Sequence, residues 1–575
     1  METRRIEHIH HALLTTAKQS LFGKISALTQ LAEPPIPLTA GEMHKVSGEI
    51  IRSAKHEVLM AFYKFSGASE GGKEIISALE ALKEKAEREK TKIRVCLLVN
   101  SRGKLAETVY KPNRSLGIDH LASSEWFTFT FVPHPTAAFG ALHSKLIIVD
   151  AEIAMVRGGD PHADNDATRA QFETASLIRG GIVSEIRYDF VDVWQAYSSE
   201  VLGLLKPSSL QSIPTHTDQS PIPCLYVSKR ENGNLFYYTD CFSPYKIAFL
   251  HAVNEAKETI HVMTSNINDP DICSAIAKAC NRGVQLYLIT GKFHNDHTEY
   301  YWGGTNLYAI ATIVSQVDLK CLKNLHVRWN TNTKSTLVKN SDPFTIHAKY
   351  ACVDLESIGL TFCGSSPLDI QAMKYSREGD LIFEDVATAK KYNDKFFVDK
   401  FAIGKDYFTD AFETLLEVIE TQTKRIEQSI ESEDQRRKAE GMRGALINIG
   451  GDSRHMLEKI MLLMENIHPY LIIRTGYKPG APESYNAVME VVTRYGLHIH
   501  LATVLKQKLP EWQMSAQNHA PAVTTVATSH FSLLKGKNEK EMTRSASFPD
   551  LLSPRLANDE GHPAVEGADS LRKSM

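Results

Sequence analysis

The stretch LHSKLIIVD, residues 142–150, places a histidine and a lysine two positions apart at the start of a short apolar run, which ends in an aspartate. The run predicts a buried β-strand. Side chains at positions i and i+2 of a strand project to one face, so we expect His143 and Lys145 to point together. Asp150 has the opposite parity, and we expect it to support the structure rather than to contact a substrate.

The same pattern occurs a second time in TIHAKYACVD, residues 345–354. His347 and Lys349 repeat the spacing of the first pair, and Asp354 repeats the aspartate. One such match in a long chain is a modest signal, whereas two matches that both enter an apolar strand are a strong one. The two His–Lys pairs are therefore the first candidates for a functional site.

The segments that precede the two motifs also repeat. IRSAKHEVLM (51–60) and VNEAKETIHV (253–262) both have the pattern of a helix end, an Ala-Lys pair and the start of a strand. Each is followed by an amphipathic stretch and a second apolar strand. Two copies of one unit form an internal repeat of domain size. Because helices and buried strands alternate in both copies, we predict an α/β fold with a sheet in each copy.

The composition of the 575-residue chain is that of an ordinary globular protein, with 43% hydrophobic and 23% charged residues. The net charge of -3 argues against a dedicated nucleic-acid binder, which usually needs a basic excess to contact phosphates. The eight cysteines include no C-x-x-C pair, so we expect reduced thiols and no zinc site. The sequence has no apolar stretch of about 18 residues and no N-terminal apolar signal, so we expect neither a membrane span nor a signal peptide.

The paired motifs resemble the duplicated HxKxxxxD signatures of the phospholipase D superfamily. GGD (158–160) and GSS (364–366) resemble the small-residue turns that follow each signature. The segment IRGGIVSEIRYDFVDVW (178–194) resembles the one that follows the first signature, with Phe190 and Trp194 in place. The family resemblance implies two similar α/β/α half-domains packed about a pseudo-two-fold axis, with a helix-rich C-terminal region outside the resemblance.

The N-terminal segment precedes the resemblance, which covers roughly residues 40–400 of the printed sequence. We expect this segment to be helical, with a helix over residues 11–31 whose apolar face is formed by Leu14, Leu21, Ile25 and Leu28. The predicted domains are the N-terminal helical segment (1–38), the first half (39–205), the second half (206–405), a helical α/β region (406–513) and a disordered tail (514–575).

The resemblance implies a phosphodiester cleavage that needs neither a metal nor another cofactor. One imidazole attacks phosphorus to form a phosphohistidine, and the other protonates the leaving alcohol. The two lysines stabilise the phosphoryl oxygens. From the resemblance alone we expect His143 to be the nucleophile and His347 the acid. The candidate catalytic set is His143, Lys145, Asp150, His347, Lys349 and Asp354.

Each histidine needs a group that fixes its tautomer. In the family an acidic residue downstream of one motif supports the histidine of the other, and the candidates here are Glu173 and Glu378. The small-residue turns supply three further supporting candidates, Gly159, Ser365 and Ser366.

One departure from the family pattern concerns phosphate recognition. The family usually carries an asparagine shortly after each small-residue turn. From the sequence we place Pro161 and Pro367 at those positions, with Asp160 and Ser366 as the nearest polar residues. The change affects both copies and leaves both His–Lys pairs whole.

The expected function is that of a phospholipase D that hydrolyses glycerophospholipids to phosphatidic acid and free head group. The alternatives are a phosphatidyltransferase similar to cardiolipin synthase, and a nuclease or other nucleic-acid phosphodiesterase. We expect a monomer, because both motifs lie in one chain, and a cytosolic or peripheral-membrane protein that binds a glycerophospholipid surface and no nucleic acid. A further hypothesis is that the polar C-terminus carries a signal for delivery of a bacterial protein into a host cell.

Overall fold

The structure is a computed structural model. The residues that the structure describes are 4–17, 23–31, 33–102, 117–118, 120–136, 140–166, 171–203, 221–231, 243–292, 304–330, 346–407 and 410.

The first half of the described chain is built on a seven-stranded sheet with the strand order β3-β9-β8-β7-β4-β5-β6. Strands β4, β5 and β6 pair in parallel, and β4 pairs antiparallel with β7. The strands are β3 (Ile36–Thr39), β4 (Glu57–Phe62), β5 (Ile93–Arg102), β6 (Phe127–Thr136), β7 (Lys145–Val149), β8 (Ile153–Arg157) and β9 (Thr174–Arg179).

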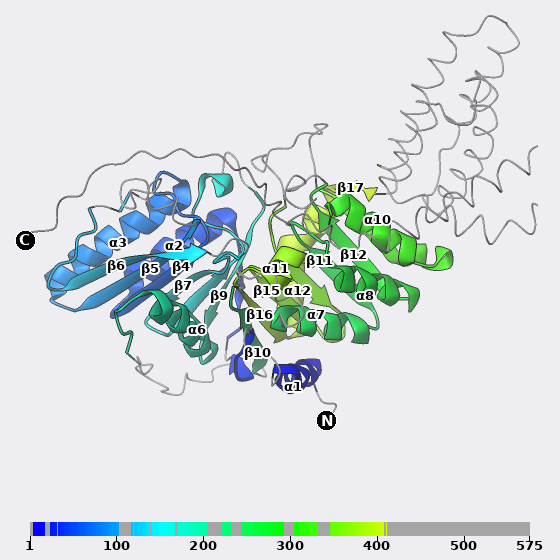
Figure 1. Cartoon of the computed structure of the whole chain (residues 1–575), viewed down its shortest axis with the longest axis horizontal. Coiled ribbons are helices and arrows are strands. Elements are labelled where there is room, and N and C mark those ends of the chain that lie inside the picture. Colours follow the sequence, from blue (N-terminus) through cyan, green and yellow to red (C-terminus); the bar gives the residue numbers. More distant parts are fainter. Residues whose placement is uncertain are drawn as a thin grey trace, which may run out of the picture. The chain divides into compact units, whose positions relative to one another are not determined.

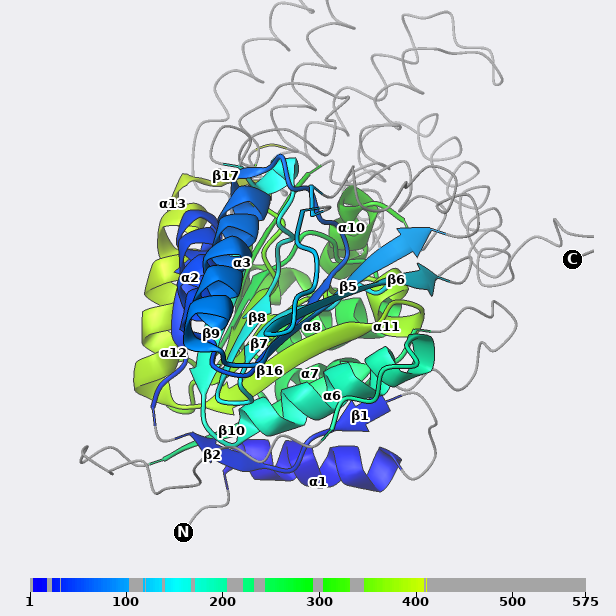
Figure 2. The ribbon, with the colours of Figure 1, turned by 90° about the vertical axis from the view of Figure 1, so that its left-hand side faces the viewer.

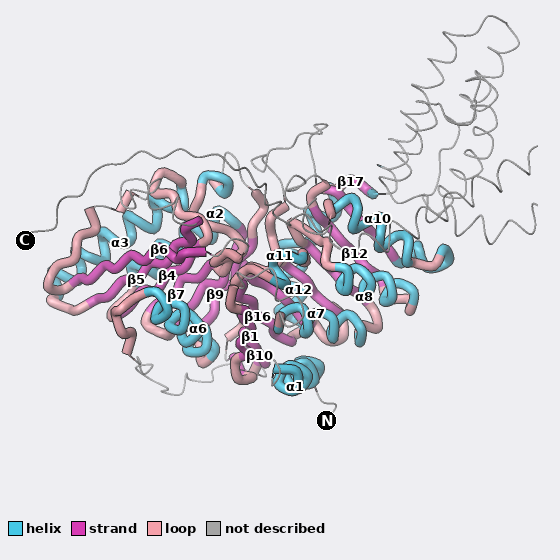
Figure 3. Tube along the Cα trace, in the orientation of Figure 1, coloured by secondary structure: helices cyan, strands magenta, loops and turns pink. Residues whose placement is uncertain are grey.

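The second sheet repeats this order as β10-β16-β15-β14-β11-β12-β13. It is extended by β17 next to β13 and by β1 and β2 next to β10, which gives ten strands (Figures 1 and 3). Its strands are β1 (Gly23–Ile25), β2 (Thr29–Leu31), β10 (Ile222–Lys229), β11 (Thr259–Met263), β12 (Gln285–Thr290), β13 (Leu325–Trp329), β14 (Tyr350–Val353), β15 (Leu360–Gly364), β16 (Glu378–Glu384) and β17 (Lys405–Asp406). Because seven strands recur in one order, the α/β fold with two similar halves is confirmed.

The repeat extends to the helices and to single backbone positions. In both halves the alanine of the Ala-Lys pair, Ala54 or Ala256, is the C-cap of a helix, and the next strand begins three residues later. The helices are α1 (Arg5–Ala17), α2 (Ala40–Ser53), α3 (Glu70–Glu89), α6 (Ile182–Tyr197), α7 (Pro244–Glu255), α8 (Pro270–Asn281), α10 (Asn306–Gln316), α11 (Ile370–Lys374), α12 (Val386–Asn393) and α13 (Asp399–Ile403).

Helices cover both faces of the first sheet, so strands such as β4, β7 and β8 are buried along their whole length. Helices α2 and α3 pack on one face, and α6 lies on the other (Figure 2). The core on the α6 side is continuous with the core of the second half. It includes Trp194 of α6 together with Tyr350 and Phe383 of the second sheet. The two halves therefore share one hydrophobic interior.

The two halves exchange backbone contacts in a reciprocal way. Leu142 forms a parallel bridge with Arg377, and Ile346 forms the equivalent bridge with Phe172. The next amide in each case donates to the same partner: the N–H of the residue after Leu142 bonds to the Arg377 carbonyl, and that after Ile346 to the Phe172 carbonyl. Each half therefore holds the strand entry of the other, as a pseudo-two-fold axis requires.

The N-terminal segment differs from the predicted helix over residues 11–31. The helix α1 spans Arg5–Ala17, and residues further along form β1 and β2, which pair with β10. The buried face of α1 is formed by Ile6, Ile9 and Leu13, whereas Leu14 is exposed. The prediction of one long helix was wrong because the described segment beyond Ala17 forms short strands that pair with β10 instead of continuing the helix.

The predicted helical region 406–513 and the predicted disordered tail 514–575 lie outside the described residues, except at 406, 407 and 410. The same holds for the C-terminal signal hypothesis. The boundaries assigned to the two halves stay a prediction. No helix in the described ranges is long and apolar enough to cross a membrane. The seven described cysteines are all buried and unlinked.

Candidate active site

The two histidines lie at equivalent places, just ahead of a central strand in each half. His143 precedes β7 and His347 precedes β14, and the reciprocal bridges bring both strand entries to the junction of the two halves. Their side chains are 17% and 21% exposed, whereas the two glutamates that contact them, Glu378 and Glu173, are almost fully buried. The junction therefore presents two accessible imidazoles in a buried polar setting.

Each imidazole is held by a carboxylate from the opposite half. Nδ1 of His143 lies 2.9 Å from Oε1 of Glu378, which is the first residue of β16. Nδ1 of His347 is hydrogen-bonded to Oε1 of Glu173, just ahead of β9. Since Nδ1 is engaged in both cases, Nε2 is the nitrogen that each ring can present to a substrate.

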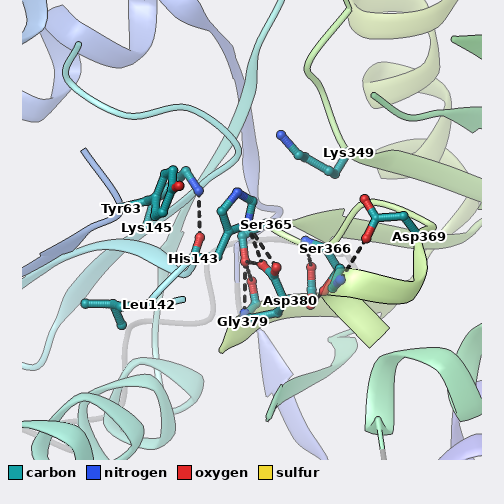
Figure 4. A network of polar contacts seen from close by, with 12 residues as sticks. Tyr63, Leu142, His143, Lys145, Lys349, Ser365, Ser366, Asp369, Gly379 and Asp380 are labelled. Carbon is teal, nitrogen blue, oxygen red and sulfur yellow. Dashed lines mark hydrogen bonds and ion pairs between the residues drawn. The ribbon is translucent and has the colours of Figure 1, made fainter. Parts of the chain in front are cut away.

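Each lysine lies beside the histidine of its own motif, and Figure 4 shows Lys145 next to His143. Lys145 Nζ donates to the His143 carbonyl at 2.6 Å, and its ammonium also lies 3.9 Å from Oδ2 of Asp160. Lys349 Nζ donates to the His347 carbonyl and lies 2.8 Å from Nδ1 of the His347 ring. Both lysines are buried, and burial lowers the pKa of Lys349 to about 8. Two buried ammonium groups beside a pair of imidazoles make this site attractive for a phosphate.

Burial and the two lysines also govern the histidines. Burial, followed by Lys145 and Lys349, holds the pKa of His143 well below its usual range. The same groups lower the pKa of His347. Burial raises the pKa of Glu173 and of Glu378 to about 7. Protonation of both imidazole rings is therefore disfavoured, and the rings are neutral near neutral pH.

The small-residue turns make room for the supporting carboxylates. A Cβ on Gly159 would lie 2.7 Å from Cγ of Glu173, so only glycine fits there. Ser365 Oγ donates to Oε2 of Glu378 at 2.5 Å. Ser366 donates to Asp380 through its backbone N–H and its hydroxyl (Figure 4). The three supporting candidates from the turns thus contact carboxylates rather than open solvent.

The strand register corrects the comparison of the two turns. Val149 pairs with Ile153 across the first hairpin, whereas Val353 pairs with Leu360 across the second. The second turn is therefore three residues longer than the first, and an alignment by composition, GGD with GSS, is displaced by one residue.

The backbone bonds that follow the hairpins agree with this register. The carbonyl of Pro161 accepts from Ser66 N–H, and the equivalent acceptor in the second half is Leu368, which accepts from Asn268 N–H. Asp160, not Pro161, is thus the counterpart of Pro367. The two prolines are therefore not equivalent, as the sequence comparison had them, and the first half carries the carboxylate of Asp160 where the second carries Pro367.

The two motif aspartates complete the motifs but do not belong to the catalytic group. Asp150 accepts from the N–H groups of the three residues 55–57, and Asp354 accepts from those of 257–259. Asp354 also pairs with Arg5 at 2.7 Å. Both have positive φ, 53° and 50°. Each therefore holds a helix-to-strand connection at the strand end remote from the histidine, which is the structural position that its parity in the motif predicts.

Two groups outside the candidate set also lie at the site. The ring of Tyr63 lies 5.3 Å from the His143 ring and 5.7 Å from Lys145 Nζ, although its place just after an apolar strand favours core packing. Asp380, which contacts Ser366, is buried behind the first imidazole. The available signal for Asp380 was its spacing: it is two residues after Glu378, so both carboxyls share a face of β16.

A model of the family described as "Cardiolipin synthase, PLD-like domain" matches residues 249–399, which contain the second His–Lys pair. The same fold and motif occur in the first half, in reciprocal contact with the second. Residues 249–399 match a phospholipase D-like domain. The resemblance seen in the sequence is thereby confirmed. In a superfamily of phosphodiesterase-type enzymes, the paired histidines are the expected centre of the chemistry.

Two curated relatives of this chain come from two strains of Helicobacter pylori, and both are described as uncharacterized proteins. Each is 21% identical over 285 residues, a match that covers 44% of this chain and 55% of the relative. The chain thus spans about half the length of these relatives.

Several solved structures also align with this chain. Phosphatidylserine synthase from Haemophilus influenzae Rd KW20 is 12% identical, with a TM-score of 0.45, and the alignment covers 69% of this chain and 92% of the synthase. Nuc from Salmonella typhimurium, a phospholipase D family member, is 20% identical, with a TM-score of 0.22 and coverage of 28% and 89%.

No group of three or more His, Cys, Asp or Glu side chains within the described ranges is placed to hold a metal ion. The groups that the described site offers to a substrate are imidazoles, carboxyls and ammonium groups of the chain itself.

Proposed function

We propose that this chain is a phospholipase D that hydrolyses glycerophospholipids to phosphatidic acid and a free head group through a phosphohistidine intermediate. The observation that carries the proposal is the crossed arrangement of the site. Two accessible imidazoles, His143 and His347, meet at one junction, and each is fixed through Nδ1 by a carboxyl of the other half. Such a pair can supply a nucleophile and an acid to a single phosphodiester.

The reaction proceeds in two displacements. In the first, Nε2 of one histidine forms a bond to phosphorus while the bond from phosphorus to the head-group oxygen breaks. The second histidine gives its proton to that oxygen as it leaves. In the next displacement the second histidine takes a proton from water, the water oxygen bonds to phosphorus, and the P–N bond breaks. Phosphatidic acid leaves, and both imidazoles regain their starting state.

The lysines stabilise the charge that develops on the phosphoryl oxygens. Lys145 and Lys349 are both buried within reach of the histidines of their own motifs, so they are held in place before the substrate arrives. Fixed cations in a buried setting stabilise a transition state more than mobile cations in water do. Removing one such donor from an active site typically costs about 100-fold to 1,000-fold in kcat.

Several features support a lipid substrate. The matching family model is described as a cardiolipin synthase domain, and cardiolipin is itself a phospholipid. The net charge of -3 provides no general attraction for nucleic acid. We infer that the chain works as a monomer at the surface of a glycerophospholipid membrane, from the cytosolic or another aqueous side, and that nucleic acid is not its partner.

A second candidate function is phosphatidyl transfer, and the description of the matching family favours it. The two functions share the first displacement and differ only in the acceptor. An alcohol in place of water would attack phosphorus and yield a new phosphodiester. The residues of the site serve either acceptor, so the distinction depends on which nucleophile reaches the phosphohistidine.

The test is incubation of the full chain with mixed phospholipid vesicles that contain a small proportion of a primary alcohol, with and without a chelator. Lipid products are read by mass spectrometry. We expect phosphatidic acid together with the phosphatidyl-alcohol, no dependence on the chelator, and loss of both products, by at least about 1,000-fold, in His143→Asn and in His347→Asn. The exposed His120 provides the control, and His120→Asn should retain full activity.

Three outcomes would count against the proposal. Turnover retained in either active-site variant would contradict a shared site. Products that disappear with the chelator would contradict the metal-free route. Release of nucleotides from DNA or RNA, with every phospholipid left intact, would move the substrate class to nucleic acids.

A further inference from the structure

A buried arginine, Arg377, lies at the junction where the second half holds the motif of the first. Its carbonyl accepts from the N–H groups of His143 and Ser144, both at 2.9 Å, and its own N–H donates to the Ala141 carbonyl at 2.7 Å. The next residue in the chain is Glu378, whose carboxyl contacts the His143 ring. Arg377 is therefore joined both to the main chain of the histidine and to the residue that orients the histidine ring.

The guanidinium of Arg377 is held by two acidic side chains. Nη2 donates to Oδ1 of Asp189 at 2.6 Å and to the Asp189 carbonyl at 3.2 Å. Nη1 lies 3.9 Å from Oε2 of Glu231. Arg377 and Asp189 are only 2% and 3% exposed. A planar guanidinium between such partners is fixed in both position and orientation, because its hydrogen bonds are strong and directional.

The two acidic side chains are themselves fixed by neighbours from several elements. Asp189 lies on α6 and accepts from two hydroxyl groups of β10. Glu231 follows β10 and contacts one residue of β6 and one of α6. The four neighbours are Tyr226 Oη at 3.2 Å, Ser228 Oγ at 2.7 Å, His134 Nε2 at 3.1 Å and Tyr197 Oη at 3.1 Å. Elements of both halves therefore converge on the side chain of Arg377.

The equivalent residue at the other strand entry is Phe172, which carries no charge. Its carbonyl accepts from the His347 N–H at 3.0 Å, as that of Arg377 does from His143. The Phe172 ring packs against the shared core, and Lys400 Nζ lies 4.7 Å from its centroid. One strand entry is thus anchored by buried ion pairs and the other mainly by apolar packing. A change of charge at Arg377 should therefore act on His143 and leave His347 in place.

A movement of Arg377 would reach the His143 imidazole by two routes. The first is the pair of main-chain hydrogen bonds that hold the strand entry. The second is the peptide link to Glu378, whose carboxyl fixes Nδ1 of the ring. A displacement of about 1 Å in catalytic geometry costs about 100-fold in rate. A buried residue that does not reach the substrate can therefore have a large effect on turnover.

We propose that Arg377 is a positioning residue of the active site, and that its buried ion pairs with Asp189 and Glu231 fix the orientation of the His143 imidazole. The effect on rate rests on the proposed phosphodiester cleavage, whereas the effect on geometry does not. Arg377 acts through the main chain and through Glu378.

The test compares two arginine–aspartate pairs whose acids lie one turn apart on α6. In the buried pair Arg377 contacts Asp189, and in the exposed pair Arg230 contacts Asp192 at 2.7 Å. We expect Arg377→Met to lower kcat for phospholipid hydrolysis about 10-fold to 100-fold, with KM changed by less than about twofold. Arg377→Lys keeps the charge and should recover part of the loss. Arg230→Met is the control and should leave both constants unchanged.

A spectroscopic measurement separates positioning from a general loss of structure. The proton between Nδ1 of each motif histidine and its glutamate should give a downfield proton resonance. The signal lost in His143→Asn and the signal lost in His347→Asn assign the two resonances. In Arg377→Met we expect the His143 resonance to shift or vanish, while the His347 resonance stays in place.

A second variant covers the case in which Arg377→Met does not fold, since this substitution leaves the buried Asp189 carboxylate without its cation. The double variant Arg377→Met with Asp189→Asn removes both charges of the pair. We expect the double variant to fold, with a displaced His143 resonance and a low kcat.

An unchanged His143 resonance or an unchanged kcat in either folded variant would overturn the proposal. Equal displacement of the His143 and His347 resonances would also overturn it, since Arg377 would then serve the fold as a whole. The same holds if Arg230→Met lowers kcat as much as Arg377→Met does. An unmodified enzyme that cleaves no phosphodiester would instead refute the proposed function, and the resonances alone would then decide whether Arg377 orients His143.

Discussion

Asp380 and Glu378 show how a difference at one position can make the two halves of a duplicated site unlike. They lie two residues apart on β16 and project from the same face, so two carboxyls share a buried space behind His143. The equivalent position in the first half holds Ala175. Burying a second ionised carboxyl costs folding free energy, so burial favours the protonated form of Asp380. The stability of the second half therefore depends on pH.

We predict that Asp380→Asn weakens the dependence of stability on pH. Burial raises the pKa of Asp380 from 3.8 to about 7, so the folded protein binds this proton more tightly than the unfolded chain. Stability therefore falls as pH rises from about 4 to about 7, with a limiting slope of about 1.4 kcal/mol per pH unit. An asparagine carries no such proton, so the urea midpoint of the variant should decline less over this range.

The control for this measurement is Asp271→Asn, because that side chain is largely exposed. It should reproduce the slope of the unmodified protein. An equally steep slope in Asp380→Asn would mean that Asp380 does not hold its proton in the folded state.

A second prediction at this scale concerns Gly159. A Cβ there would lie within 2.9 Å of two carbons of the Glu173 side chain, which would be displaced from His347. A displacement of about 1 Å in catalytic geometry costs about 100-fold in rate. We expect Gly159→Ala to lower kcat by roughly this factor with little change in the melting temperature.

Gly181→Ala is the matched control, because a Cβ at Gly181 meets no atom within 4 Å. Equal activities of the two alanine variants would show that Glu173 tolerates displacement and does not position the imidazole.

The sequence alone could predict which side chains lie together when the residues are close to each other in the chain. His143 and Lys145 share a face because strand geometry acts over two residues, and the repeat at His347 and Lys349 follows from the same rule. It could not place Asp160 correctly, since the length of the turn after the motif decides the register and differs by three residues between the halves. Tyr63 joins the site through tertiary packing, which no local spacing reveals.

At the scale of elements, the N-terminal helix α1 belongs structurally to the second half. Arg5 extends from it to the carboxylate of Asp354, at the end of β14. The amide of Ile6 donates to Glu384 of β16 at 2.7 Å. The residues after α1 form β1 and β2, which pair with β10. The segment therefore closes an edge of the second sheet and neutralises a buried charge.

We predict that Arg5→Ala destabilises the protein by about 3 kcal/mol, because it leaves the buried Asp354 carboxylate without its cation. The thermal midpoint should fall accordingly, while the residual activity at low temperature stays near that of the unmodified enzyme. Arg4→Ala is the control, since Arg4 makes an exposed bond to Pro221 and should cost less than about 0.5 kcal/mol. Equal midpoints for the two variants would contradict a role for α1 in holding the second half.

The failure of the predicted helix over residues 11–31 has a physical cause at this scale. Helical periodicity and the pairing of short strands at a sheet edge can be satisfied by the same apolar residues. Leu31 illustrates the ambiguity, because it is completely buried as the last residue of β2, next to Ile222 of β10. The neighbour that settles the choice lies far along the chain and is not visible in a local window.

At the scale of the whole molecule, both His–Lys pairs come from one chain. Each imidazole is supported by a carboxyl that lies 235 or 174 residues away in the sequence. We predict that a mixture of His143→Asn and His347→Asn recovers no activity, because a monomer cannot combine one intact histidine from each variant. The measurement is phospholipid turnover of the mixture after joint refolding. Recovery toward roughly one quarter or more of full activity would indicate exchange of halves between two chains.

The sequence alone suggested the overall α/β plan because the duplication supplied two observations of every important pattern. The contacts between the halves were accessible only through the family resemblance, since nothing local pairs His143 with Glu378 or His347 with Glu173.

The reciprocal hydrogen bonds at the strand entries have a consequence for motion. The amide of His143 is held by the Arg377 carbonyl, and that of His347 by the Phe172 carbonyl. Neither amide can become free without loosening the other half as well. In a hydrogen-exchange experiment the two amides should lose protection in one cooperative opening, with a common free energy. A thermal fluctuation would then displace both histidines together. A site with only one of the two histidines in place would not be exposed to a lipid surface.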